Sequence, residues 1–296
     1  MRREAACGAL VALLVALGTV GSARAQGEHV LQYAPVIPAR ISLVSRSEIT
    51  MIVMPTGQAL PDTLTIEATR LEGATQFVDA AASGRYSIVL QYDSVRARMR
   101  PRGGLWQDLE VEEHEVATVR AVLNERLEVL QAEFLNSPHL QASKADMVRG
   151  LIGGVLVTLP AGPVARGDPW MTEVAYPLAF LGSIGEEEGA PHHGELTAHA
   201  TAQIDSLAQY GGDTLYYVTV RGSFVPAPFN SLLSGVPAAV TVEGSFAAML
   251  VWSSTWNAFI SSAARAVLRM DIRDLQGGAT GSQVRFDVIT RSQVRL

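Results

Sequence analysis

The feature that most constrains the fold of this chain is an alternation of apolar and polar residues over many short stretches. Leu64, Ile66 and Ala68 alternate with threonine and glutamate, and similar stretches occur at 86–93, 196–204, 265–273 and 284–288. A period of two places the apolar side chains on one face of a β-strand. Parallel strands buried on both faces would instead read as continuous apolar runs. The sequence therefore predicts an antiparallel sheet with one buried face.

One segment, residues 112–134, departs from this alternation. Its apolar residues recur at spacings of three and four, which is the spacing of an amphipathic α-helix; they are Val116, Val119, Leu123, Leu127, Leu130 and Phe134. Acidic residues crowd its start, where the helix dipole favours negative charge, and Pro138 follows its end, where proline stops a helix. We therefore expect an α+β fold, mostly antiparallel β, in which one or more curved sheets pack on this long amphipathic helix.

Two other segments have less regular patterns. Ser143 and Asp146 are placed as a capping box, and Gly153-Gly154 follows at helical distance, which favours a second, shorter helix. The stretch 246–272 fits either a helix or two strands that turn at Ser253-Ser254, and we favour the strands.

The middle of the chain is rich in turn formers between Leu159 and Trp170, which indicates a joint between two halves. The N-terminal half, 26–160, contains the expected helix, and the C-terminal half, 161–296, is antiparallel β; one continuous domain is the alternative. Residues 64–69 and 196–201 have similar patterns. This similarity leads to the hypothesis that the two halves are an internal duplication.

The first 25 residues have the organisation of a secretory signal peptide. Arg2 and Arg3 precede an apolar run at 9–17, and small residues end at Ala25. This run is shorter than the roughly 20 residues of a membrane-spanning helix. We expect cleavage after Ala25, export to the periplasm or the exterior, and no transmembrane segment afterwards. Cys7 is the only cysteine, so the mature chain has no disulfide and no thiolate ligand.

The charge of the chain argues against two classes of partner. The formal net charge is −6 at pH 7, and removal of the leader, with three arginines and one glutamate, makes it more negative. Nucleic-acid affinity comes largely from basic residues that neutralise phosphates, and anionic membranes also attract basic segments. We expect neither partner.

The only cluster that resembles a metal site is His192-His193 with Glu195 and His199. On a strand, His193 and His199 would lie about 20 Å apart at about 3.3 Å per residue, too far to share one ion. On a helix their spacing misses that of a zinc-binding H-E-x-x-H motif. The sequence therefore predicts no metal site.

No catalytic or cofactor-binding motif withstands the same test. Ser183 lies near glycines but lacks the spacing of a nucleophile elbow, and the glycines of 150–154 lack the lysine of a phosphate-binding loop. The paired carboxylates at 112–113 and 186–188 fit a solvated surface. We assign no catalytic residue and no cofactor, and do not expect an enzyme.

Leu159-Pro160, Pro163-Val164 and Gly167-Asp168-Pro169-Trp170 together resemble a motif of an uncharacterised family of exported bacterial β-rich proteins. In that family the motif joins two halves, and the resemblance implies the same layout here. No activity is established for the family, so the resemblance implies none for this chain. Physically, Gly167-Asp168 supplies a turn and Trp170 a large apolar anchor.

Two functions follow from these observations. The first is a non-enzymatic binding or carrier protein that holds an apolar small molecule or lipid in a groove between sheet and helix, where Ala198, Ala200 and Ala202 leave room. The alternative is a structural or protein-interaction module of the cell envelope, and an enzyme of unknown class ranks below both. We do not expect an outer-membrane barrel, because terminal aromatics are lacking and a long helix has no place in a barrel wall.

Overall fold

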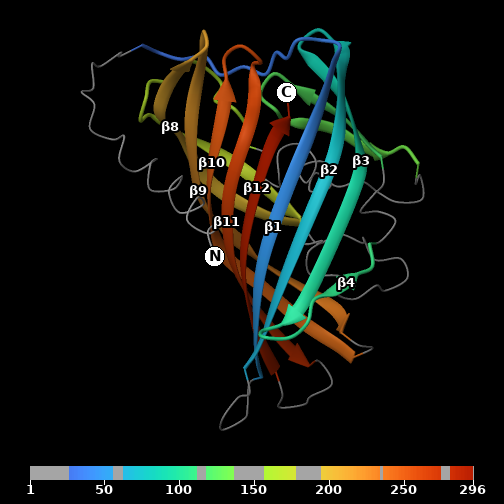
Figure 1. Ribbon diagram of the computed structural model, residues 1–296. Helices are drawn as coiled ribbons and strands as arrows, with labels where there is room; N and C mark the ends of the chain where they lie inside the picture. The colour runs from blue at the N-terminus through green and yellow to red at the C-terminus, as the bar shows by residue number, and fades with distance from the viewer. Residues whose placement is uncertain are drawn as a thin grey trace, which may run out of the picture.

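The computed structural model describes residues 27–55, 63–111, 118–136, 157–177, 195–233, 236–274 and 281–295, and all regular structure within these ranges is β-strand (Figure 1). The strands are β1 (Ala39–Pro55), β2 (Leu64–Ala82), β3 (Arg85–Pro101), β4 (Gln107–Leu109), β5 (Val119–Asn124), β6 (Val129–Phe134), β7 (Pro169–Pro177), β8 (Glu195–Tyr210), β9 (Asp213–Leu233), β10 (Val236–Ser253), β11 (Ala258–Asp274) and β12 (Gly281–Arg295).

The strands form one antiparallel sheet of twelve strands with the order β6-β5-β3-β2-β1-β12-β11-β10-β9-β8-β7, and β4 pairs with β3. Most neighbours in the sheet are also neighbours along the chain. The exceptions are the pairing of β3 with β5 and the pairing of β1 with β12. The latter extends from Ser42 opposite Arg295 to Pro55 opposite Ser282. One continuous sheet therefore contains strands of both predicted halves, which meet where β1 pairs with β12. Internal duplication of the two halves stays a prediction.

The sheet has an inner and an outer face of opposite character. In β10 the inner side chains Val240, Val242 and Leu250 are fully buried, whereas the alternate residues Glu243 and Ser245 are exposed. The same alternation continues through β8, β9, β11 and β12, and their inner residues join one hydrophobic cluster. Figure 1 shows the sheet strongly curved, with the long strands in a continuous wall. The predicted one-sided antiparallel sheet is confirmed.

Small residues on β8 make room for large neighbours on the adjacent strands. Ala202 lies opposite Trp170 of β7, and Ala198 lies opposite Phe224 of β9. Gly222 of β9 lies between Ala200 and Phe246 in register, and a Cβ there would meet the Phe246 ring at 2.9 Å. The alanines thus contribute to a wall in which large and small side chains alternate, a pattern that gives dense packing.

The two edges of the sheet are joined at one end by a strap, residues 157–164, which is not a strand. The strap contacts the β5–β6 turn through the Leu159 amide, which donates to the Arg126 carbonyl at 2.9 Å. It contacts β7 through the Thr158 carbonyl, which accepts from the Trp170 indole at 3.0 Å. Val157 and Leu159 of the strap are fully buried. Hydrogen bonds from the strap therefore reach both edge regions.

Residues 27–38, the N-terminal segment, lie across the same end. The Tyr33 amide donates to the Glu125 carbonyl in the β5–β6 turn, and the Ala34 amide donates to the Asn257 carbonyl in the β10–β11 turn. Leu31 and Tyr33 are buried, and the Tyr33 ring packs edge-on against Tyr86 at 5.2 Å. Burial, with the nearby Tyr86, raises the pKa of the Tyr33 phenol far above its usual value, so this phenol stays uncharged.

The predicted helix at 112–134 is wrong. Residues 118–136 form the hairpin of β5 and β6, and residues 112–117 lie outside the described residues. A spacing of four is also an even number, so a strand places Val119 and Leu123 on one face, with Ala121 between them, and all three are buried. Leu127 occupies the turn with a φ of 61°. The Asn124 side-chain oxygen fixes this turn by accepting from the Arg126 and Glu128 amides.

The predicted fold class, which depended on this helix, is also wrong. The described chain is all-β, not α+β, and the inner face packs on the strap, the N-terminal segment and the opposite wall instead of a long helix. The shorter helix expected at 143–154 lies outside the described residues. The hairpin expected at 246–272 is confirmed, with β10 and β11 joined by the turn at 254–257.

A single carboxylate links two turns at the closed end. Asp213, which begins β9 directly after the β8–β9 turn, accepts hydrogen bonds from Ser253 at the end of β10 and from Ser254 and Thr255 in the β10–β11 turn. Although burial raises the pKa of Asp213, these hydrogen bonds outweigh it and hold the pKa below its usual value. The ionised carboxylate therefore stabilises the contact between the turns.

We predict that Gly222→Ala lowers the free energy of unfolding by about 2 kcal/mol, because the added Cβ would lie 2.5 Å from the His199 carbonyl oxygen and force the strands apart. Gly162→Ala is the matched control, since nothing lies within 4 Å of its Cβ. Urea unfolding measures both. Equal stability of the two variants would contradict this packing.

We also predict that Asp213→Asn destabilises the protein by about 1 kcal/mol at neutral pH, a value reduced by the partial exposure of the site. Because the pKa of Asp213 is lowered on folding, its contribution is complete above the usual aspartate pKa and is lost as the pH falls through the lowered value. Unfolding curves of the two proteins should converge in acid. A difference independent of pH would contradict the role of the charge.

Candidate functional site

A row of polar side chains interrupts the apolar inner face where β11, β12, β1 and β2 lie side by side. Ser262, Ser292, Ser45 and Glu72 occupy directly opposed positions on these four strands. All four are buried. Thr290, Ser47 and Arg70 form a second row, two residues further along the same face. We call these seven residues the polar seam.

The seam contains a buried ion pair. Arg70 Nε lies 2.6 Å from Glu72 Oε1, and the two side chains are only 13% and 7% exposed. Residues two apart on a strand share a face, so β2 itself points both groups inward. Removing two charges from water costs several kcal/mol, and a hydrophobic pair of similar size is often at least as stable. The pair therefore has no evident advantage for stability alone.

Hydroxyl groups lie on one side of the ion pair, on β1 and β12. Ser47 Oγ and Thr290 Oγ1 are 3.0 Å apart and share a hydrogen bond. Ser292 Oγ is buried and has no hydrogen-bond partner among the described residues. A buried hydroxyl without a partner costs about 1–3 kcal/mol, and a ligand oxygen or a water would supply that partner.

Apolar residues continue the inner face on one side of the seam. Met99, Ala68, Ile49 and Val288 are directly opposed on β3, β2, β1 and β12, and Ile66, Met51 and Phe286 form the next row. We call these seven residues the inner trough. Val288 and Phe286 are buried, whereas the members on β1–β3 are partly exposed. The members on β1–β3 therefore keep part of their surface exposed, and Ile49 and Met51 also pack against the core.

The arrangement is suited to binding rather than to catalysis. The seam presents hydroxyls and an ion pair that is neutral as a whole, and the trough presents apolar surface beside it. The described residues contain no group of three or more histidine, cysteine, aspartate or glutamate side chains that could hold a metal ion. An amphipathic molecule matches both parts, because its polar end can hydrogen-bond and its apolar part can be buried.

Of the four residues weighed as metal ligands, the structure describes Glu195 and His199. His199 lies on the outer face of β8 and is exposed. Glu195 begins β8, and His192 and His193 lie outside the described residues. So do Ser183, the carboxylates at 112–113 and 186–188, and the glycines of 150–154.

The region of the family-like motif has a structural role at the closed end. Gly167 has a φ of 87°, a conformation that favours glycine, and its amide donates to the Ile204 carbonyl. Trp170 is buried, and its indole bonds to the strap. The predicted turn and anchor are both present. The family resemblance itself stays a prediction.

Sequence reasoning missed the seam, although one signal for it exists. Leu64, Ile66 and Ala68 were recognised as one face of a strand, and Arg70 and Glu72 continue the same parity. A strand that carries two charges on its apolar face is unusual. The serines of β1, β11 and β12 give no such signal, because only the register of four strands brings them together.

Comparisons with known proteins give little guidance. No family model matches the chain, and no curated protein matches it. Similar solved structures include Salmonella typhi OmpF in complex with daunomycin, with a TM-score of 0.22, 10% identity, and coverage of 84% of this chain and 97% of that one. An outer-membrane channel of Pseudomonas putida F1 has a TM-score of 0.20 and 10% identity, with coverage of 93% of this chain and 100% of that one. Pseudomonas aeruginosa OpdQ has a TM-score of 0.18 and 5% identity, with coverage of 87% of this chain and 98% of that one.

TM-scores of this size do not establish a shared fold, so we transfer no property of these channels to this chain. What the structure itself establishes is a β-rich protein. No helix within the described ranges has the length and hydropathy needed to cross a membrane.

We predict that Glu72→Leu alone destabilises the protein by about 3 kcal/mol, because it removes the carboxylate that lies 2.6 Å from the buried Arg70 guanidinium. The double variant Arg70→Met, Glu72→Leu should recover most of this loss, because neither charge remains. Urea unfolding of the two variants and the parent protein tests the prediction. A double variant as unstable as the single one would contradict it.

Proposed function

We propose that this chain is an exported, non-enzymatic binding protein of the cell envelope that holds an amphipathic ligand on its inner face, in the periplasm or outside the cell. The apolar part of the ligand occupies the inner trough, and its polar end hydrogen-bonds to the polar seam. The observation that carries the proposal is the buried seam itself, with the Ser292 hydroxyl lacking a partner among the described residues.

The character of the seam supports a ligand whose polar end has no net charge. Arg70 and Glu72 balance each other, so neither an anion nor a cation gains from both groups. Hydroxyl-rich ends such as glycerol can donate to and accept from Ser45, Ser47 and Ser292. Uncharged lipids of the monoacylglycerol class have this chemistry.

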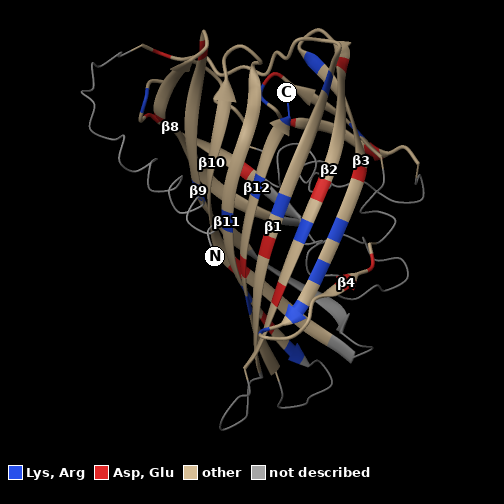
Figure 2. Cartoon of the chain, viewed as in Figure 1, with Lys and Arg blue, Asp and Glu red and all other residues tan. Residues whose placement is uncertain are grey.

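The outer face supports a location in water for the wall formed by β10–β12 and β1. Figure 2 shows both basic and acidic residues on β1, β11 and β12. Outward ion pairs include Arg265 with Asp287, Arg269 with Glu243 at 3.7 Å, and Arg291 with Glu48 at 3.8 Å. A lipid-facing wall would lose about 2–4 kcal/mol for a central arginine. The charged side chains of this wall thus support a carrier whose outer face is hydrated and whose inner face is apolar.

We predict that monocaprin, a medium-chain monoacylglycerol, binds and shifts the methyl NMR signals of Met51 and Met99, which lie in the trough. Ala68→Trp fills the trough and should weaken binding about tenfold or more, because a packed site has no room for both side chain and ligand. Thr69→Trp, on the outer face of the same strand, is the matched control.

A second variant tests the seam without adding bulk. Ser292→Ala should weaken monocaprin binding about threefold to tenfold, the range of one net hydrogen bond, whereas Ser223→Ala on the outer face should not. The proposal fails if the Met51 and Met99 signals stay unmoved by monocaprin in the folded protein. It also fails if Ala68→Trp and Thr69→Trp bind it equally.

A protein-interaction module of the envelope is the second candidate, because the edge strands expose apolar residues. Met171 of β7 is 72% exposed and Leu130 of β6 is 47% exposed, and within the described residues each strand pairs on one side only. Such edges can accept a strand from another protein. Under this alternative, native mass spectrometry of protein purified from its own envelope shows a stoichiometric protein partner and no lipid.

A further inference from the structure

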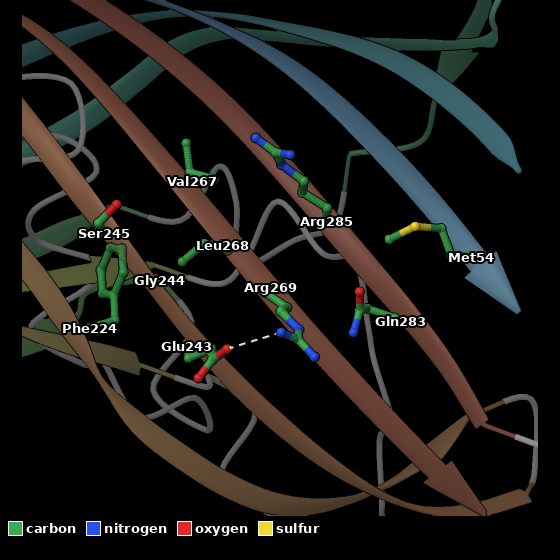
Figure 3. A pocket seen from close by; sticks show the side chains of 10 residues that line it. All are labelled: Met54, Phe224, Glu243, Gly244, Ser245, Val267, Leu268, Arg269, Gln283 and Arg285. Carbon is green, nitrogen blue, oxygen red and sulfur yellow. Dashed lines mark ion pairs between the residues drawn. The ribbon is translucent and has the colours of Figure 1, made fainter. Parts of the chain in front are cut away.

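The outer face of the sheet contains a hollow of about 600 Å³ over β10, β11, β12 and the end of β1. Figure 3 shows the side chains that line it, with Arg269 and Arg285 projecting from neighbouring strands. Met54 and Val267 supply apolar surface, and Phe224 and Leu268 belong to the core beneath. The volume is within the range of small-molecule sites.

The hollow coincides with an irregularity in the sheet. The pairing of β10 with β9 shifts between Val242 and Gly244, and a bulge of this kind bends the strand and increases its twist. Gly244 permits a close approach to β11, because a Cβ there would lie 2.2 Å from the Val267 carbonyl oxygen. The site is therefore part of the fold and not a gap between mobile side chains.

Two arginines lie beside this hollow. Arg269 of β11 and Arg285 of β12 occupy directly opposed positions, and like charges at such positions destabilise a sheet. Figure 3 shows the two side chains extending in opposite directions, with Arg269 toward Glu243 and Arg285 toward Val267.

The nearby carboxylates pair with Arg265 and Arg269. Asp287 makes two hydrogen bonds with Arg265, which hold the pKa of Asp287 below its usual value. Asp271 contacts Arg269 and accepts a hydrogen bond from Gln283 at 2.9 Å, and Glu243 lies 3.7 Å from Arg269. Arg285 makes no ion pair with any described carboxylate, although its charge also helps to lower the pKa of Asp287. Of the two arginines, Arg285 is therefore the one that can receive an anion.

We propose that this hollow binds a small organic acid with an apolar chain or ring. Its carboxylate pairs with the guanidinium group of Arg285, and its apolar part covers Val267 and Met54 beside it. Arginine suits this task because its planar fork of donors matches a carboxylate. The site is separate from the inner trough, since Met54 and Met51 lie on opposite faces of β1.

Octanoate is the probe, and methyl NMR of the methionines is the readout, with the Met54 signal assigned through Met54→Leu. Octanoate should shift the Met54 signal in a saturable manner, and octanol, which has the same chain without the charge, should not. Arg285→Gln should weaken octanoate binding about tenfold or more, because it removes a charge-assisted contact. Arg221→Gln, an exposed arginine of the outer face beyond the hollow, is the control.

Three results would overturn the proposal: an unmoved Met54 signal, an equal shift with octanol, or equal octanoate affinity of the Arg285→Gln protein and its control. A shift confined to Met51 and Met99 also overturns it, because octanoate would then occupy the inner trough. That last result would leave the proposed binding function of the trough intact.

Discussion

The closure of the sheet at one end is the constraint on which the rest of the structure depends. A curved sheet with two free edges would leave its inner face open, and the hydrophobic effect favours covering it. Here the cover is irregular chain: the strap bonds to both edge regions, and the N-terminal segment crosses to two turns. Leu31, Tyr33, Val157 and Leu159 then extend the core to the end of the sheet. Strand pairing alone does not achieve this.

A closed end lets the strands carry different chemistry along their length. Near the turns, the inner face is tightly packed, with Trp252 edge-on to Phe259 at 5.0 Å. Further along, the same face changes to hydroxyls and an ion pair, and beyond them to apolar side chains that are partly exposed on β1–β3. Rigid packing at one end thus positions the polar seam, because each strand keeps a fixed register with its neighbours from the turns onward.

Much of the sheet could be predicted from sequence, because a buried face imposes alternation directly on each strand. The segment at 119–134 was predicted wrongly, because the spacing of Val119 and Leu123 fits a helix and a strand equally well. The turn that Asn124 fixes by its hydrogen bonds makes the segment a hairpin. The candidate site was harder to find. Glu72 and Ser45 are neighbours only through strand pairing, and pairing of β1 with β12 joins residues from opposite ends of the chain. No local pattern encodes such a register.

Strand β1 also limits how this protein can change over evolutionary time. Its inward residues belong to the seam and the trough, and its outward residues include Met54 at the hollow and Glu48 in an ion pair. Because side chains alternate, inserting or deleting one residue in mid-strand would turn every later side chain to the opposite face. Length variation among relatives should therefore collect at the strand ends, and β1 itself should keep a constant number of residues even where its composition diverges.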